Sequence, residues 1–207
     1  MSRRFRHHVN PLSEQYLAFT PNPPTIVGTA LEVELGCAEG EFLFRRAMQK
    51  PGHQVVGVEI RRDLVARINS MAGDLPPDQI VQGIFANLNI HVPVLFARET
   101  VDRFFINFPD PWFKKQHHKR RVLTPELLGQ LCDALKPDGE LFFQSDIFDL
   151  ALDALAVFEE FGTGRIRNVL GPWSFMGENP YGVPTRRELH VTEKGGPIWR
   201  MLYTPLS

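Results

Sequence analysis

The sequence predicts an α/β fold in which helices cover both faces of a mainly parallel sheet. Strand-like segments alternate with helical ones along most of the chain, an order typical of parallel strands joined by crossover helices. The run Phe104-Phe105-Ile106 is apolar throughout, as in strands buried on both faces. Two late strand-like segments follow with no clear helix between them, which predicts an antiparallel C-terminal hairpin at one edge of the sheet.

Proline, glycine and helix-capping residues set the limits of the predicted elements. Thr124-Pro125-Glu126 is a strong helix start, with a cap, a proline at the first position and an acid near the positive helix end. Helices are predicted at 41–48, 62–72, 124–135 and 147–161, and strands at 30–35, 54–59, 80–82, 101–108, 140–145, 188–192 and 198–203. Several prolines leave residues 1–28 as a basic, proline-rich arm before a domain at 29–207.

Composition narrows the class of protein. The chain has 207 residues, 23 Lys and Arg against 24 Asp and Glu, and a net charge of -1. That balance argues against a wholly basic nucleic-acid binder but leaves room for a local basic patch. No apolar run approaches the ~18 residues of a membrane helix, and two cysteines without metal-type spacing predict no metal site. We therefore expect a cytoplasmic protein that needs neither membrane nor metal.

Residues at the strand ends are expected to form one site. Ligands of open α/β sheets bind at the carboxyl ends of the strands. The residues that this rule brings to one crevice are Leu35, Gly36, Glu59, Asn87, 108–112, Ser145 and Asp146.

The segment Glu34-Leu-Gly36-Cys-Ala-Glu-Gly40 follows a strand and opens a helix. Its two glycines allow a tight turn and a close approach of the backbone to a ligand. Glu59 ends the next strand, where an acid can accept hydrogen bonds from ribose hydroxyls. The pattern favours an adenosine-type ligand over a plain strand–turn–helix.

S-adenosylmethionine suits this loop better than a dinucleotide does. A dinucleotide fingerprint requires Gly-x-Gly-x-x-Gly, and here Ala38 stands at the third motif position. S-adenosylmethionine carries no phosphate and has a cationic ammonium and sulfonium, which the acids Glu34 and Glu39 would complement. Glu34 could equally be a strand acid paired with an arginine, and Glu39 could face solvent.

The stretch after the predicted strand 101–108 is the most informative. Pro109 and Pro111 flank Asp110 and restrain its backbone on both sides. From Lys114 to Arg121, five of eight residues are Lys or Arg, two are His and none is acidic, which suits a phosphate backbone. The alternative for Pro109-Asp110-Pro111 is a simple turn that ends the strand. The alternative for the basic run is a solvated charged face.

These residues resemble the signature of the bacterial tRNA (guanine-N7-)-methyltransferases. The resemblance rests on Phe108-Pro-Asp-Pro-Trp112 followed by Lys-Lys-x-His-His-Lys-Arg-Arg, with matching motifs at 34–42, 57–62 and 185–188. It implies a class I methyltransferase fold, which is Rossmann-like. It also implies transfer of a methyl group from S-adenosylmethionine to N7 of guanosine 46 in the variable loop of tRNA, leaving S-adenosylhomocysteine. Trp112 or Tyr181 could stack on the displaced base.

The resemblance also assigns roles to residues. Those at cofactor positions are Glu34, Gly36, Glu59, Asn87 and Asp110, and Asp110 takes the active-site position as well. Those at tRNA positions are Lys114, Gln116, His117, His118, Lys119, Arg120, Arg121, Asp146, Thr185, Arg186, Arg187 and Glu188. The chain departs from the family pattern at Ala38, where glycine is usual, at Asn87, where many members have Asp, and at Arg187, where an aromatic is common. Either a monomer or a homodimer is compatible with this pattern.

Three rival functions are less well supported. A methyltransferase acting on an exocyclic amine would carry Asp/Asn-Pro-Pro-aromatic, whereas the order here is Pro109-Asp110-Pro111-Trp112. A non-catalytic RNA-binding protein on a methyltransferase scaffold would not need the acids of the cofactor site. A dinucleotide oxidoreductase would need the missing glycine triplet.

Overall fold

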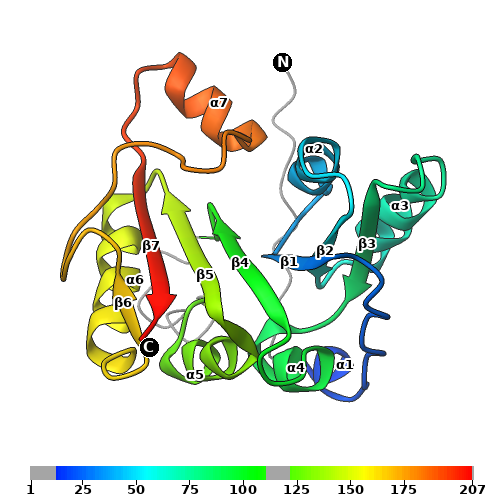
Figure 1. The fold of residues 1–207 in the computed structure, drawn as a ribbon, viewed down its shortest axis with the longest axis horizontal. Helices are drawn as coiled ribbons and strands as arrows, with labels where there is room; N and C mark the ends of the chain where they lie inside the picture. Colours follow the sequence, from blue (N-terminus) through cyan, green and yellow to red (C-terminus); the bar gives the residue numbers. More distant parts are fainter. Residues whose placement is uncertain (1–12, 111–121, 207) are drawn as a thin grey trace.

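A seven-stranded sheet forms the centre of the computed structural model, which describes residues 13–110 and 122–206 (Figure 1). The strands of this described part are β1 Ala30–Leu35, β2 His53–Glu59, β3 Ile80–Phe85, β4 Val101–Asn107, β5 Leu135–Ser145, β6 Ile166–Asn168 and β7 Trp199–Pro205. They lie in the order β3-β2-β1-β4-β5-β7-β6. The pairs from β3 to β5 are parallel, and β7 runs antiparallel to both β5 and β6.

Helices cover both faces of the sheet, as predicted. One face packs on α4 Leu88–Leu95, α5 Pro125–Ala134 and α6 Phe148–Phe161 around a large apolar core. The other face packs on α2 Glu41–Gln49 and α3 Arg62–Ala72. The helix α7 Arg186–Glu193 lies beyond the carboxyl ends of β4 and β5 (Figure 1).

The two faces of the sheet differ in polarity. In β1, the apolar side chains of Leu31 and Val33 point into the core under α4 to α6, and Glu32 and Glu34 point to the opposite face. Gln144 of β5 and Arg200 of β7 are also buried. A layer of buried polar side chains therefore runs across the sheet toward α7.

Most predicted elements are confirmed, with small changes of boundary. The helix predicted from Thr124 is α5, and the Oγ1 of Thr124 accepts a hydrogen bond from the N–H of Leu127 at 3.2 Å. Residues 88–95, which carry no clear sequence pattern, form α4. Strand β5 begins at Leu135 rather than at residue 140, because Leu135 pairs with Val101 across an irregular register.

The predicted strand at 188–192 is wrong, since these residues belong to α7. Thr185 and Glu188 form a capping box: the Oγ1 of Thr185 accepts from the N–H of Glu188 at 3.1 Å, and the Glu188 carboxylate accepts from the N–H of Thr185 at 3.3 Å. This local pairing starts a helix and overrides the alternating pattern of the segment. The antiparallel edge pair consists instead of β6 and β7.

The described part of the N-terminal arm packs against the β3 edge of the sheet. It includes one short helix, α1 Glu14–Leu17. The side chain of Gln54 accepts from the N–H of Val27 and donates to the carbonyl of Thr25. The ring of Phe19 stacks on Phe85 with a centroid distance of 4.5 Å. Residues 1–12 lie outside the described residues, and the predicted boundary at residue 28 stays a prediction.

We expect Thr185→Ala to lower the free energy of unfolding by about 1 kcal/mol, because it removes the N-cap of α7. Denaturant unfolding measures this loss. Thr192→Ala is the matched control, since Thr192 is exposed within the same helix and caps nothing at its start. Equal stability of the two variants would contradict a stabilising capping box.

Candidate active site

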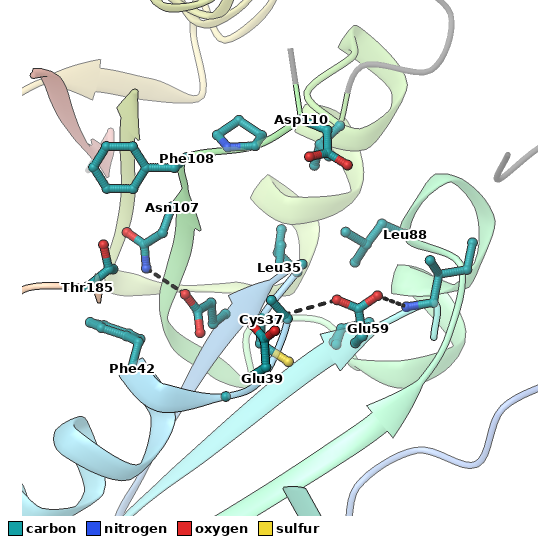
Figure 2. A pocket seen from close by; sticks show the side chains of 18 of the residues that line it. Leu35, Cys37, Glu39, Phe42, Glu59, Leu88, Asn107, Phe108, Asp110 and Thr185 are labelled. Atoms are coloured by element: carbon teal, nitrogen blue, oxygen red, sulfur yellow. Dashed lines mark hydrogen bonds between the residues drawn. The ribbon is translucent and has the colours of Figure 1, made fainter. Parts of the chain in front are cut away.

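A cavity of about 560 Å³ opens at the carboxyl ends of β1, β2 and β4 (Figure 2). Its volume lies within the range of small-molecule sites. Gly36, Glu59, Asn87 and Asp110 line it together, which confirms that these distant segments converge. Ser145 and Asp146, which were expected in the same crevice, are not part of the lining. Asp146 adjoins it through an ion pair with Arg187, which does line the cavity.

The loop between β1 and α2 turns tightly through left-handed residues. Gly36 and Gly40 have φ angles of 80° and 76°, and Ala38 has a φ of 50°. This region costs a residue with a Cβ about 1 kcal/mol, which explains why glycine would suit position 38. The N–H of Ala38 donates to Oε2 of Glu59 at 3.0 Å, so the strained loop is tied to the end of β2.

Glu59 is buried and engaged on both oxygens. Its Oε1 accepts from the backbone N–H groups of Ile60 and Arg61 at 2.9 and 3.1 Å. The guanidinium of Arg61 donates to both oxygens at 3.0 Å, and this hydrogen-bonded pairing raises the pKa of Arg61. Arg61 is a site residue that the sequence reasoning missed, although it follows the acid by two positions.

Glu34 is buried in the cavity lining with one oxygen unpaired. Its Oε1 accepts from Nδ2 of Asn107 at 2.8 Å (Figure 2), and its Oε2 has no hydrogen-bond partner among the described residues. The pKa of Glu34 is raised to about 8: burial raises it most, the hydrogen bond from Asn107 lowers it, and the charge of Glu59 raises it. Such a carboxyl is poised to receive a cationic group, which would favour its ionised form.

The alternative in which Glu34 pairs with an arginine fails, because Glu32 takes that place. Arg46 donates to both oxygens of Glu32 at 2.6 and 2.9 Å, and Arg103 donates to Oε1 at 3.1 Å. Burial raises the pKa of Glu32, but the bonds from Arg46 outweigh it and the pKa is lowered overall. The pKa values of the two acids of β1 are therefore shifted in opposite directions, because Glu32 has arginine partners and, in the described part of the chain, Glu34 has only Asn107.

Asn87 caps α4 at the edge of the cavity. Its side-chain Oδ1 accepts from the N–H of Asn89 at 3.1 Å, and its Nδ2 donates to the carbonyl of Tyr16 at 3.3 Å. Its own N–H donates to Nδ1 of His91 at 3.0 Å. The arm thus contacts the back of a residue that lines the cavity.

Asp110 lies at the cavity rim, half-buried, just after a strained turn. Phe108 has a φ of 48°, a left-handed conformation that is rare for an aromatic residue and rarer before proline. Its N–H still donates to the carbonyl of Gln144 at 2.8 Å, one step beyond the end of β4. This turn brings the carboxyl of Asp110 near Arg61, whose pKa it helps to raise.

The 185–188 motif divides into two parts. Thr185, Arg186 and Arg187 line the cavity, and Arg187 donates through Nε to Oδ2 of Asp146 at 3.1 Å. Glu188 points inward instead and accepts from Arg200, Asn179 and Gln144. Glu188 would therefore contribute to RNA binding only indirectly, by stabilising the start of α7.

Several predicted residues lie outside the described residues: Pro111, Trp112, Lys114, Gln116, His117, His118, Lys119, Arg120 and Arg121. Tyr181 is described and does not line the cavity. Its ring packs at 4.9 Å from Phe105 and 5.2 Å from Phe142, and its hydroxyl donates to Glu140. The packing of Tyr181 outside the lining gives no support to base stacking on it, which stays a prediction.

Residues 13–110 and 122–206 contain neither a candidate metal cluster nor a membrane-spanning helix. No group of three or more His, Cys, Asp or Glu side chains there could hold a metal ion. None of the helices in this part is long and apolar enough to cross a membrane.

Residues 29–201 match the family model described as "Putative methyltransferase". The tRNA (guanine-N(7)-)-methyltransferase of Synechococcus sp. (strain JA-3-3Ab) is 39% identical over 97% of this chain and 85% of its own length. The chain belongs to the tRNA (guanine-N(7)-)-methyltransferase family. A second family member, from Synechocystis sp. (strain ATCC 27184 / PCC 6803 / Kazusa), is 39% identical over 96% of both chains.

The fold of this chain is similar to those of solved methyltransferases. The 16S rRNA methyltransferase KamB aligns with a TM-score of 0.59 and 15% identity over 87% of this chain and 89% of its own. The 16S rRNA (adenine(1408)-N(1))-methyltransferase from Catenulisporales acidiphilia aligns with a TM-score of 0.60 and 10% identity over the same shares. At such identities the likeness concerns the fold alone, and it confirms the predicted class I methyltransferase architecture.

We expect the buried carboxyl of Glu34 to make the folded protein less stable as pH rises from about 5 to about 8. Its pKa is about 8 in the folded state against an ordinary 4.5, so the folded state holds more protons than the unfolded state in that window. The unfolding free energy of the wild type minus that of Glu34→Gln should therefore fall steadily as pH rises through this window. Denaturant unfolding at several pH values measures it.

The matched control is Glu39→Gln, which removes an exposed acid from the same loop. The change of the unfolding free-energy difference with pH should be larger for Glu34→Gln than for this control. A constant difference for Glu34→Gln would show that Glu34 is ionised in the folded protein throughout this range.

Proposed function

We propose that this family member transfers the methyl group of S-adenosylmethionine to N7 of guanosine 46 in the variable loop of tRNA, within the cavity at the carboxyl edge of the sheet. Supporting the proposal is the convergence of Glu34, Glu59, Asn87 and Asp110 on that cavity. Each comes from a different segment and takes the position that the family signature gives it. A cytoplasmic location belongs to the same proposal.

The residues present fit this cofactor. The carboxyl of Glu34, with its unpaired Oε2, suits the ammonium of the methionine part. Glu59 accepts hydrogen bonds at the end of β2 and would take the ribose hydroxyls, where Arg61 now covers it. Asn87 would border the adenine, and the turn at Gly36 would let the backbone approach. When bound, S-adenosylmethionine supplies a methyl group already activated by its sulfonium.

Asp110 acts on the guanine side of the reaction. Guanine N7 has a free lone pair at neutral pH, so no residue has to remove a proton before methyl transfer. The protein's main tasks are to align the reacting atoms and to exclude water. A carboxylate held near the ring stabilises the positive charge that methylation leaves on the purine, or accepts from its N1–H and N2–H groups. Asp146, fixed by Arg187, takes the other of these two roles.

The cationic residues hold the tRNA. Arg186 and Arg187 face the cavity from α7, and the run from Lys114 to Arg121 follows Asp110 directly. Within that run Lys114, Gln116, His117, His118, Lys119, Arg120 and Arg121 would contact the phosphate backbone and guide the nucleotide to the cavity. The target nucleotide must leave the tRNA core, which costs a few kcal/mol of unstacking.

We expect Asp110→Asn to lower methyl transfer at least about a hundredfold, since loss of one well-placed electrostatic contact typically has that effect. Binding of S-adenosylmethionine, measured by calorimetry, should persist. The assay incubates unmodified tRNA with labelled S-adenosylmethionine and maps the modified nucleotide. A cationic N7-methylguanine at position 46 is expected, whereas a neutral N-methylated base would favour the exocyclic-amine reaction.

Asp149→Asn is the control for this variant, because Asp149 is exposed at the start of α6. It should transfer methyl groups at the wild-type rate. Near wild-type turnover by Asp110→Asn would remove Asp110 from the reaction.

We expect Arg120→Ala combined with Arg121→Ala to weaken tRNA binding and to reduce its salt dependence. Each lost phosphate contact lowers the slope of log K against log salt by about 0.9 on duplex nucleic acid and by about 0.7 on single strands. Filter binding over a range of salt concentrations measures the slope. The exposed pair Arg165 and Arg167 on the β6 side provides a double-alanine control, and an unchanged slope for Arg120 and Arg121 would exclude them from the interface.

A further inference from the structure

A chain of buried hydrogen bonds crosses the sheet to Glu34. Nε of Arg200 donates to Oε1 of Gln144 at 3.2 Å. Nε2 of Gln144 donates to Oδ1 of Asn107 at 2.9 Å, and Nδ2 of Asn107 donates to Oε1 of Glu34 at 2.8 Å. These four residues come from β7, β5, β4 and β1, which are neighbours in the sheet.

The direction of this chain is fixed by its two charged ends. Arginine can only donate hydrogen bonds, so the oxygen of the Gln144 amide must face Arg200. Its NH₂ group must then face Asn107, and it also donates to Oε2 of Glu188 at 3.1 Å, a group that can only accept when ionised. With its own oxygen committed to Gln144, Asn107 has only its NH₂ group left for Glu34.

We propose that Arg200 and Gln144 are positioning residues of the cofactor site, which act through Asn107 to hold Glu34 as an ionisable acceptor with its second oxygen available to the cation of S-adenosylmethionine. This inference rests on the proposed function, in which Glu34 binds that cation. Neither Arg200 nor Gln144 lines the cavity. Their effect on the cofactor is transmitted by the orientation of one amide.

The orientation of Asn107 shifts the pKa of Glu34. Its NH₂ group lowers the pKa of a carboxyl that burial raises. If the amide were reversed, its oxygen would face Glu34, and only protonated Glu34 could then pair with it. A reversed Asn107 would thus favour the neutral acid and deprive the cofactor of its counter-charge.

The double variant Gln144→Glu with Glu188→Gln should reverse the amide of Asn107 while the net charge of the protein stays the same. The new carboxylate at 144 accepts from Arg200 as before, but it cannot donate to Asn107, which must turn its NH₂ group toward it. Oε2 of Glu188 accepts from both the N–H of Thr185 and Nε2 of Gln144. The new glutamine at 188 therefore either keeps its oxygen on the capping box of α7 or turns its NH₂ group toward the new carboxylate. Other ionisable groups around the cavity remain unchanged: Cys37, Glu39, Glu41, Glu59, Arg61, Asp110, Arg186, Arg187 and His190.

We expect the double variant to bind S-adenosylmethionine at least tenfold more weakly than the wild type at pH 7, with little change in its thermal midpoint. Calorimetry over a pH series should show that the rise of affinity with pH moves to higher pH. The single variant Glu188→Gln is the control, because Arg200 still sets the orientation of Gln144, and its affinity for the cofactor should stay near that of the wild type.

The outcomes separate this inference from the proposed function. Wild-type affinity and pH profile in a folded double variant, with weakened binding in Glu34→Gln, would overturn the inference alone. Wild-type affinity in Glu34→Gln would instead remove Glu34 from the proposed cofactor site. If the double variant does not fold, Gln144→Met decides: it removes the donor to Asn107 without adding a charge, and undiminished affinity in that variant would overturn the inference.

Discussion

The hydrogen bond between Asn107 and Glu34 is the interaction on which the site depends. A carboxyl this deeply buried loses most of its hydration, so its charge state follows from the few groups that touch it. One oxygen has a donor from β4, and the other has none. The sheet therefore presents half of a binding interaction, and the remaining half must come from whatever enters the cavity.

Backbone strain is concentrated around the same cavity. Ala38 and Phe108 both have left-handed backbone conformations, each costing on the order of 1 kcal/mol. Both are held by hydrogen bonds to neighbouring strands, Ala38 through Glu59 and Phe108 through the carbonyl of Gln144. Both strained residues follow the end of a strand, where the chain turns toward the cavity. Regular helix or strand geometry would not allow these turns, so the site requires the strained backbone.

Sequence reasoning succeeded where chemistry is local. The strand at 30–35, the cap at Thr124 and the convergence of strand ends follow from short patterns and from the geometry of parallel sheets. It failed at 188–192, where the capping box of Thr185 and Glu188 starts a helix in place of the predicted strand. It also missed Gln144 and Arg200, because they are 56 positions apart in sequence and only the antiparallel pairing of β5 with β7 brings them together.

Stability alone does not explain the polar layer of the sheet that links Arg200 to Glu34. Replacing buried ionic or polar networks by apolar side chains of similar volume is often neutral or even stabilising, and the opposite face of this sheet shows that apolar residues fill such space well. A fully connected set running from Arg200 to Glu34 has a different property: each amide has one permitted orientation. That property adds little to folding free energy, but it determines which atom faces the cavity. The polar layer is therefore better understood as part of the site than as part of the core.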